Sequence, residues 1–318
     1  MTQYIMRRLV LFVPTLLLAT GMIFTILRVI PGDVAALIVT AGGEGKFNER
    51  AYREVRRQLE LDKPIPVQYA LWLADALRGD FGRSYWSKTE VRDELLERLP
   101  VTLELALAAP LLALLLGVPL GVVSAVKQNS PVDYLARATA ITGLSVPHFW
   151  LGIVLILVLA NYFDWVVPLR YAELWEDPRT NISQMVWPVI VLGTTFTALL
   201  ARVTRSAMLE VLRSEYIRTA RAKGLRPLAV VGRHGLRNAL LPIVTVFGAQ
   251  LGALISGAVV TERVFNVPGM GRYFVESVFV RDFPVVQAVV LLIALAYLIV
   301  NLVIDLTYAW LDPRIRYT

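Results

Sequence analysis

Residues able to do covalent or metal chemistry are few and scattered in this sequence. It contains no cysteine, which excludes thiol catalysis, thiolate metal sites and disulfides. Its two histidines, His148 and His234, lie far apart, and no His-Glu-x-x-His zinc pattern occurs. Neither a Gly-x-Ser-x-Gly nucleophile elbow nor a Gly-x-x-x-x-Gly-Lys-[Ser/Thr] phosphate loop is present. We therefore expect no enzyme active site, no metal and no cofactor in this chain.

One group of residues is suited to docking instead, in the polar segment 204–242. Ser214 is placed to cap a helix beginning at Glu215, whose carboxylate suits the positive end of a helix dipole. Gly224 can end that helix in the left-handed conformation, and Pro227 can begin a second short helix. The sequence predicts a short helix–turn–helix.

Three side chains of this helix lie near one face, at positions i, i+1 and i+4: Tyr216, Ile217 and Ala220. Such a set can fill a groove on a cytoplasmic partner. A hairpin lying on the lipid surface, with its arginines facing anionic headgroups, remains the alternative. A DNA-binding helix–turn–helix is disfavoured because both ends continue directly into apolar runs.

A second group lies in the apolar run after this segment. Gly248, Gly252 and Ser256 recur every four residues, and Thr245 and Gln250 stand among them. Small residues at this spacing let membrane helices approach closely. Two interpretations stay open. The stripe packs inside one subunit, or it lies on the axis of a translocation path with Thr245 and Gln250 facing water.

The elements that must position these groups are membrane spans. Of 318 residues, 56% are hydrophobic and 18% are charged, against about 25% charged in an average soluble domain. A bilayer core needs about 20 mostly apolar residues per helix. Six runs qualify, at residues 9–27, 101–126, 134–163, 186–203, 238–260 and 285–311. We expect an all-α membrane protein with six spans, divided into a first span (1–30), an extracytoplasmic segment (31–99) and a five-helix core (100–318).

Basic residues predict the orientation. Nine Lys and Arg residues lie between Arg202 and Arg237, whereas the two short loops on the other side hold fewer. The positive-inside rule then places this segment and both termini in the cytoplasm, in a bacterial or archaeal inner membrane. The net charge of +7 is explained by lipid contact at that face, without nucleic acid.

The extracytoplasmic segment is predicted to be helical and amphipathic. Asn48 can cap one helix and Pro66 can begin another, while Ser87 with Glu90 reads as a capping box for a third. These helices could cover the end of the bundle or serve as a landing surface for an extracytoplasmic partner. The periodicity serves both interpretations.

The docking segment resembles a known family motif. Glu215, Ala220, Gly224 and Leu241-Pro242 match the EAA loop of ABC-importer permeases, although Tyr216-Ile217 stand where the generic loop has Ala-Ala. Other stretches resemble the dipeptide/oligopeptide/nickel permease subfamily, at residues 28–33, 61–64, 68–69, 79–84, 98–102, 267–271 and 312–317. Together these motifs cover nearly the whole chain in order.

The resemblance implies a machine of two permease subunits, two ATPase subunits that bind ATP and Mg, and an extracytoplasmic substrate-binding protein. It implies the type I importer fold, with residues 215–224 as the coupling helix and a second homologous permease as partner. The expected solutes are di- and oligopeptides, and nickel chelates, glutathione or oligosaccharides stay open. A proton- or ion-coupled carrier is the functional alternative, disfavoured because the spans hold few ionisable residues near mid-membrane.

Overall fold

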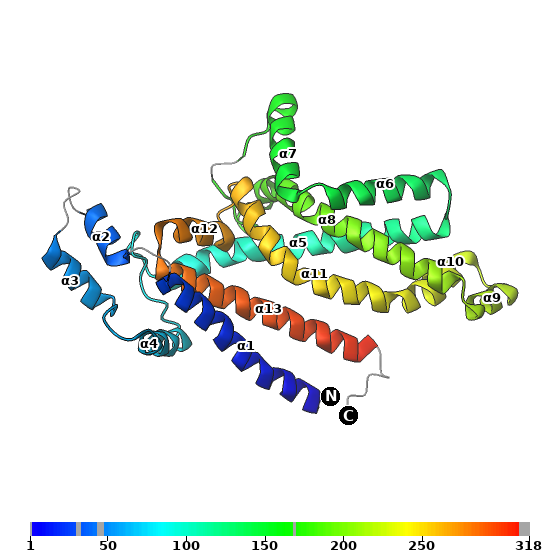
Figure 1. Cartoon of the computed structure of the whole chain (residues 1–318). Coiled ribbons are helices and arrows are strands. Elements are labelled where there is room, and N and C mark those ends of the chain that lie inside the picture. The colour runs from blue at the N-terminus through cyan, green and yellow to red at the C-terminus, as the bar shows by residue number, and fades with distance from the viewer. Residues whose placement is uncertain (1, 30–32, 43–47, 168–169, 312–318) are drawn as a thin grey trace. The chain divides into compact units, whose positions relative to one another are not determined.

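The computed structural model describes residues 2–29, 33–42, 48–167 and 170–311, and this part of the chain is almost wholly helical (Figure 1). The elements in order are α1 (Thr2–Val29), α2 (Val34–Gly42), α3 (Glu49–Gln58), α4 (Ile65–Leu77), α5 (Val91–Val126), α6 (Pro131–Ser145), α7 (His148–Phe163), α8 (Pro178–Leu212), α9 (Glu215–Ala222), α10 (Pro227–Ala229), the π-helix η1 (Val230–Leu236), α11 (Arg237–Val264), α12 (Met270–Val280) and α13 (Phe283–Leu311). Within those ranges no strand forms beyond an isolated bridge between Arg83 and Glu90. The all-α expectation is confirmed. The motif at 312–317 and part of that at 28–33 lie outside the described residues.

Contacts along the backbone divide the chain into two compact units. One contains Thr2–Pro100 with Tyr273–Leu298, and the other contains Val101–Arg272 with residues 299–311. The first span and the predicted extracytoplasmic segment therefore belong to one unit, together with the first half of α13. The second unit holds the helices that carry both candidate groups of residues.

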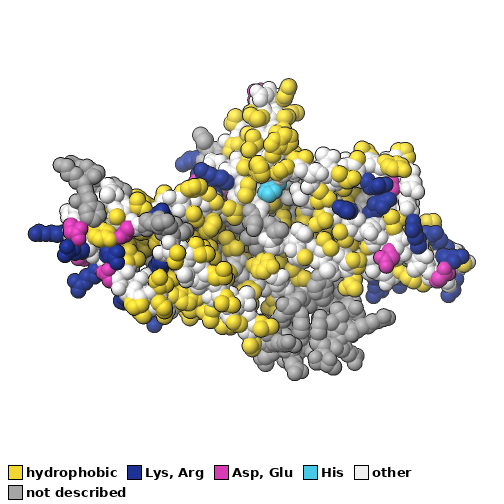
Figure 2. Space-filling model, viewed as in Figure 1, with side chains coloured by type: hydrophobic (Ala, Val, Ile, Leu, Met, Phe, Trp, Pro, Cys, Tyr) yellow, Lys and Arg dark blue, Asp and Glu magenta, His cyan; other side chains and the backbone are white. Residues whose placement is uncertain are grey.

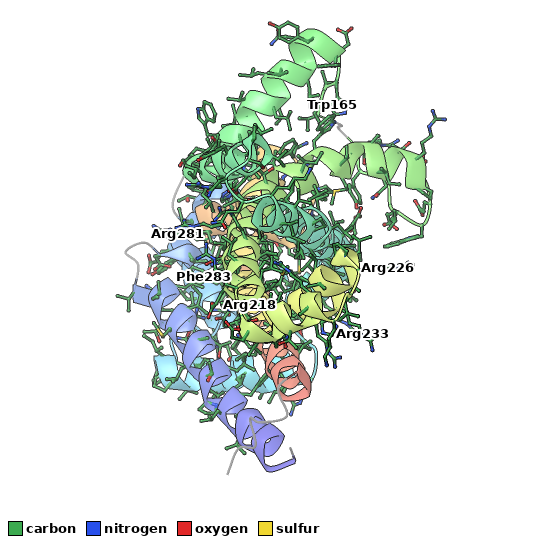
Figure 3. All side chains as sticks on the ribbon, turned by 90° about the vertical axis from the view of Figure 1, so that its right-hand side faces the viewer. Trp165, Arg218, Arg226, Arg233, Arg281 and Phe283 are labelled. Carbon is green, nitrogen blue, oxygen red and sulfur yellow. The ribbon has the colours of Figure 1, made fainter. Side chains whose placement is uncertain are left out.

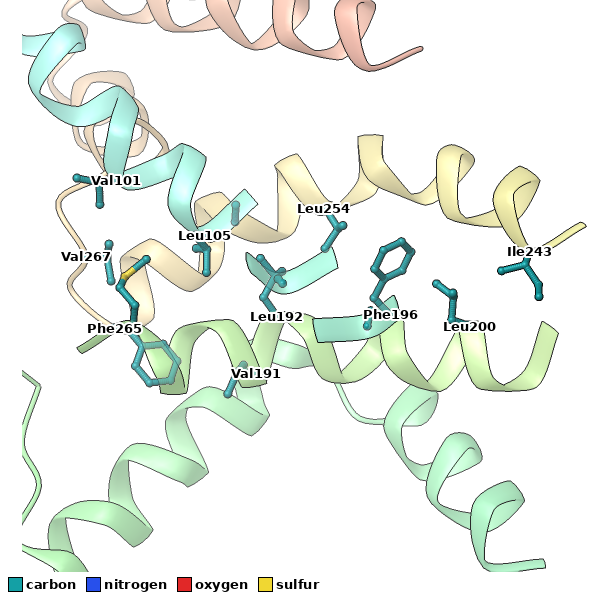
Figure 4. Close-up of a cluster of buried hydrophobic side chains, with 14 of the residues drawn as sticks. Val101, Leu105, Val191, Leu192, Phe196, Leu200, Ile243, Leu254, Phe265 and Val267 are labelled. Atoms are coloured by element: carbon teal, nitrogen blue, oxygen red, sulfur yellow. The ribbon is translucent and has the colours of Figure 1, made fainter. Parts of the chain in front are cut away.

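The second unit is built around α8. Its side chains Val191, Leu192, Phe196 and Leu200 are buried against α5, α7 and α11 in one apolar cluster (Figure 4). Phe196 stacks on Phe247 of α11 with ring centroids 5.4 Å apart. Aromatic stacking of this kind contributes beyond the burial of area. The core thus fixes α11, and with it the Gly-rich stripe, against α8.

The helices can account for up to six spans, but two of these are bent pairs rather than the single straight spans that we predicted. Four helices are long and apolar enough to cross a membrane, and two further bent pairs bring the number to six. The run 134–163 is broken into α6 and α7, which meet at 102°. The physical cause is Pro147: Val146 before it is extended, with φ −90° and ψ 122°, as the residue preceding a proline prefers.

The extracytoplasmic segment begins with two caps that the structure explains. Asn48 accepts hydrogen bonds from the amides of Arg50 and Ala51, so its predicted capping role for α3 is confirmed. Asp33 accepts from the Ala35 amide at 2.9 Å at the start of α2 and from the Tyr52 hydroxyl of α3.

These contacts set the pKa of the Asp33 carboxyl. Burial opposes the shift, but the hydrogen bond from Tyr52, those from backbone amides and the charge of Arg56, 3.5 Å away, together lower it. Asp33 therefore joins the start of α2 to α3 as a carboxylate.

The helix α4 departs from the amphipathic pattern predicted for this segment. Two of its large apolar side chains, Leu71 and Leu77, are 38% and 82% exposed. Gln68 is buried instead, and Trp72 is half-buried. Specific partners decide the face, because Tyr69 and Trp72 pack on Phe24 of α1 with centroids 5.4 and 5.9 Å away.

The predicted capping box at Ser87 and Glu90 is wrong. The helix α5 begins at Val91, one residue after Glu90, so Glu90 cannot be its third residue. Lys88 has φ +60°, which no helix accepts, and the Ser87 hydroxyl pairs with Thr89 rather than with a helix amide. The chain makes a tight turn here before the long helix starts.

Candidate functional site

The helix α9 forms as predicted, from Glu215 to Ala222. At its end Gly224 has φ +74°, and the Leu225 amide donates to the Ala220 carbonyl at 3.3 Å, which is the Schellman pattern. At its start Ser214 is the N-cap residue, but its side chain does not cap. Its hydroxyl donates back to the Val211 carbonyl at 2.6 Å, so this detail of the prediction is wrong.

One face of α9 is held inside the chain. Ile217 is fully buried and Ala220 is 7% exposed, and both pack with Val230 of η1 in a small apolar cluster. Val211 and Leu212, at the end of α8, complete it. Ile217 and Ala220 thus fix α9 on its own scaffold rather than offer side chains to a partner.

The other face of α9 is open. Glu215 and Arg218 form an exposed ion pair of 2.7 Å, with 81% and 71% of their side chains accessible. Tyr216 is 44% exposed. Figure 3 looks onto this end of the second unit, with Arg218, Arg226 and Arg233 labelled, and Figure 2 shows basic side chains gathered there.

Two exposed leucines complete this surface and were not singled out from the sequence. Leu225 is 42% exposed and Leu228, in α10, is 88% exposed. The signal was present in the sequence, because Leu225 precedes Pro227 and Leu228 follows it in a segment too short to have a periodic apolar face. We call Tyr216, Leu225 and Leu228 with Glu215 the tip surface.

The start of the fifth span agrees with the predicted run at 238–260 to within one residue. The π-helix η1 passes directly into α11 at Arg237, and Pro242 lies inside α11. The second short helix at Pro227 is confirmed, as a single turn. The tip is therefore joined to α11 by continuous helical backbone.

The stripe on α11 splits between packing and exposure. A Cβ on Gly248 would lie 2.6 Å from the Ile304 side chain of α13, so this glycine serves close packing within the chain. Thr245 is exposed and donates to the Leu241 carbonyl at 2.8 Å. Gln250 and Gly252 are half-buried. The side chain of Ser256 lies outside the described residues.

A buried carboxylate near the end of α11 was missed as a structural centre. Glu262 is 0% exposed, and it accepts from the Thr102 hydroxyl at 2.7 Å and from the Arg272 amide at 2.9 Å. The Thr102 hydroxyl in turn accepts from the Met270 amide. Gly269 leaves room for it, because a Cβ there would lie 2.3 Å from the carboxylate carbon. Two of the family-like motifs, at 98–102 and 267–271, thus meet on one side chain.

A second buried acid ties the other end of this unit. Asp133 of α6 is 0% exposed and receives two hydrogen bonds from the Arg205 guanidinium of α8, at 2.7 and 2.8 Å. The Ser124 hydroxyl and the Asn129 amide donate to the same carboxylate. Among the described residues both carboxylates are held by structural partners, which disfavours a mid-membrane proton relay at either one. Among the described residues no cluster of acids and histidines is placed to hold a metal ion.

Comparison with known proteins identifies this architecture. The model of binding-protein-dependent transport system inner membrane components matches residues 117–317, and the model of their N-terminal part matches residues 1–106. The chain belongs to this family. It is therefore a multi-pass permease component of an ABC importer in the inner membrane, and the resemblance seen in the sequence is confirmed.

Similar proteins extend over the whole chain. It is 40% identical to the di/tripeptide transport system permease protein DppB of Pseudomonas aeruginosa, covering 100% of this chain and 99% of that protein. It is 41% identical to the glutathione transport system permease protein GsiC of Salmonella paratyphi A, covering all of both.

Solved structures support the fold. The inward-facing methionine transporter MetNI matches 69% of this chain and 96% of its own with a TM-score of 0.57 at 18% identity. An amino acid ABC transporter crystallised with histidines matches with a TM-score of 0.51. The fold is that of the type I importer permeases.

Proposed function

We propose that this chain is one of two homologous permease subunits of an ATP-driven importer for di- and oligopeptides. An extracytoplasmic binding protein delivers the solute, and two ATPase subunits that bind ATP and Mg supply the energy. The full-length similarity to a di/tripeptide permease supports the solute class. The absence of a phosphate loop from the sequence supports the division of labour.

The observation that carries the proposal is the tip surface. An exposed aromatic and two exposed leucines, rimmed by charge, form the kind of patch that marks a protein interface. Buried Ile217 and Ala220 make the tip rigid, so a push on it is transmitted through η1 into α11. Binding of ATP by the partner would then favour one permease state through differential contact with the tip, as alternating access requires.

The tip lies on the cytoplasmic side in this proposal, together with both chain ends. The nine basic residues between Arg202 and Arg237 support that orientation, since short cytoplasmic segments are enriched in Lys and Arg. Thr245, Gln250, Gly252 and Ser256 line the translocation path in this proposal, while Gly248 holds α11 on α13.

Glutathione is a second candidate solute. The observation in its favour is the 41% identity to a glutathione permease, compared with 40% to the di/tripeptide permease of Pseudomonas aeruginosa. Both solutes are short peptides, so one importer class covers them.

The test is reconstitution of the complete importer in proteoliposomes with Leu228→Glu in this chain. Burying a leucine at a docking site is worth about 1.5–3 kcal/mol, so we expect ATP hydrolysis stimulated by loaded binding protein to fall about tenfold or more. Val126→Glu is the matched control and leaves it unchanged, because Val126 is 51% exposed at the end of α5 that this proposal places in the cytoplasm, outside the tip surface. Equal stimulation in wild type and Leu228→Glu would refute docking through the tip. Competing uptake of labelled dialanine and glutathione decides the solute.

A further inference from the structure

A groove between α5, α6 and α8 of the second unit contains no residue of the tip surface or of the stripe on α11. At one end it widens to a cavity of about 490 Å³, whose described lining includes Arg137, Arg202 and Arg205 and no acid. A second cavity of about 380 Å³ continues from it, because the two share four lining residues, Leu120, Ala136, Ala140 and Ala201. The groove is therefore basic at one end and largely apolar along the rest.

The helices α6 and α8 pack against each other and run antiparallel (Figure 1). The Arg205 guanidinium of α8 donates two hydrogen bonds to the Asp133 carboxylate of α6, at 2.7 and 2.8 Å. Further along α6, a Cβ on Gly143 would lie 3.1 Å from the Ala198 Cβ, which precedes Arg205 on α8. These two contacts fix the register of the pair.

This register places Arg137 and Arg202 opposite each other. Arg137 lies one helical turn after Asp133 on α6 and shares its face. Arg202 lies about one turn before Arg205 on α8 and shares its face in the same way. Both Arg137 and Arg202 are exposed, and both line the wider cavity. Two guanidinium groups thus reach one cavity from facing helices.

Of the three arginines, Arg205 alone has an acid partner within the described chain. That acid, Asp133, is fully buried and also accepts from the Ser124 hydroxyl and the Asn129 amide, so its roughly four acceptor sites are filled. The other two arginines form no ion pair with any described residue. Neighbouring like charges repel, and an anion between them replaces repulsion with attraction. The basic end of the groove therefore suits an anionic ligand.

The apolar part of the groove indicates what carries that anion. Its lining includes Leu116 and Ile190, which are 48% and 36% exposed. From Arg202 to Ile190 the helix rises about 18 Å, close to the ~15 Å depth of hydrocarbon in one leaflet. Arg137 and Arg202 lie at the same end of the predicted spans at 134–163 and 186–203, where headgroups lie. A peptide segment at that depth would leave backbone groups without partners, whereas an acyl chain has none to satisfy.

We propose that this groove binds an anionic phospholipid. Its phosphate lies between Arg137 and Arg202, since guanidinium groups pair with phosphate oxygens through parallel hydrogen bonds. One acyl chain lies along α5 and α8 over Leu116 and Ile190. The site depends neither on the solute that the importer carries nor on docking through the tip.

The test is native mass spectrometry of the full chain and of the complete importer in neutral detergent micelles. The probes are the anionic lipid dioleoylphosphatidylglycerol, the zwitterionic lipid dioleoylphosphatidylcholine with the same acyl chains, and glycerol 3-phosphate. We expect the wild type to bind the anionic lipid about tenfold or more tightly than the zwitterionic one. Because a hydrogen bond to a charged group is lost, Arg137→Met and Arg202→Met should each remove most of that preference.

Further variants separate the parts of the site and control for folding. Thr139→Trp fills the apolar part from an exposed position whose hydroxyl bonds only to its own helix, and it should weaken binding of the anionic lipid several-fold. Arg213→Met, at an exposed arginine just after α8 and outside the groove, is the control for loss of charge. Arg137→Met and Arg202→Met should leave thermal unfolding in lipid-free detergent unchanged, since neither arginine has an acid partner among the described residues.

A preference for the anionic lipid that is lost in Arg137→Met and Arg202→Met but kept in Arg213→Met supports the site. Equal binding of the two lipids by the wild type, which needs no substitution, would overturn it. So would a loss in Arg213→Met as large as in Arg202→Met, or unchanged binding by Thr139→Trp. Glycerol 3-phosphate bound as tightly as the anionic lipid would make the ligand a free phosphate and overturn it too. Lipid bound by the isolated chain but not by the complete importer would mean that the second permease covers the groove, which also contradicts the proposal.

Discussion

The fit between Gly269 and the Glu262 carboxylate gives the sharpest prediction. In Gly269→Ala the new Cβ would lie 2.3, 2.4 and 2.5 Å from the carboxylate carbon and its two oxygens. The carboxylate cannot turn away freely, because it is fully buried and holds Thr102 and the Arg272 amide. The φ of Gly269 is not positive, so steric overlap rather than backbone strain carries the cost.

The magnitude follows from two terms. Overpacking in a filled interior costs about 1–3 kcal/mol, and losing one hydrogen bond to a charged group costs about 1.5–3 kcal/mol. We expect Gly269→Ala to lower the free energy of unfolding by about 3 kcal/mol or more. Glu262→Ala leaves two partly buried donors, the Thr102 hydroxyl and the Arg272 amide, without their acceptor and should cost about 2–6 kcal/mol. In the double variant the new methyl group meets no carboxylate. The destabilisation of the double variant should therefore be smaller than the sum of the two single destabilisations, by about 2–3 kcal/mol.

The assay is unfolding of the purified chain by SDS titration in mixed micelles, with the four members of the cycle measured together. Gly232→Ala is the control, since a Cβ at Gly232 would meet nothing within 4 Å. Strictly additive costs for Gly269→Ala and Glu262→Ala would refute the reasoning. So would a Gly269→Ala variant as stable as Gly232→Ala.

Three further predictions address other parts of the molecule. Because the pKa of Asp33 is lowered in the folded state, its carboxylate stabilises the fold fully above the unfolded-state pKa of about 3.9, and this stabilisation is lost as pH falls through the lower folded-state pKa. Asp33→Asn should therefore reduce the loss of folding stability below about pH 4 in an acid titration. An acid titration identical to that of the wild type would contradict this. Arg205→Met leaves the Asp133 carboxylate buried without its cation and should lower the free energy of unfolding in SDS by about 3–5 kcal/mol. Adding Asp133→Asn to that variant should restore most of the lost stability. If it restores none, the loss does not come from the ion pair. Gly252→Leu should slow peptide uptake without preventing assembly of the importer. Gly248→Leu should instead impair folding, because the new side chain would collide with Ile304. Normal uptake by the Gly252→Leu importer would show that α11 does not line the translocation path at this position.

The sequence predicted local features where one segment contains both the cause and the effect. Asn48 caps α3 through amides two and three residues away, and Gly224 ends α9 through bonds inside the same turn. Four of the six predicted spans correspond to single long helices, because burial in lipid needs only a long apolar run.

Predictions failed where a contact with a residue remote in sequence determines the local conformation or the buried face of a helix. Ser87 and Glu90 satisfy a capping pattern, but Ser84 is bound by the Asp282 carboxylate, nearly 200 residues later, and the turn follows from that. The face of α4 depends on Phe24 and Arg28 in the same way. On α9, spacing grouped Tyr216, Ile217 and Ala220, and only the position of Val230 separates the exposed residue from the buried pair.

These long-range partners also explain why the family-like motifs say more about fold than about solute. Thr102 and Gly269 both contact the Glu262 carboxylate, and the Ser84 hydroxyl donates a hydrogen bond to Asp282. Such residues join the ends of helices that are remote in sequence, and any member of the fold needs them whatever it carries. That is why permeases named for dipeptides and for glutathione resemble this chain equally well. Selection of the solute must therefore depend on residues outside those motifs or on the delivering protein.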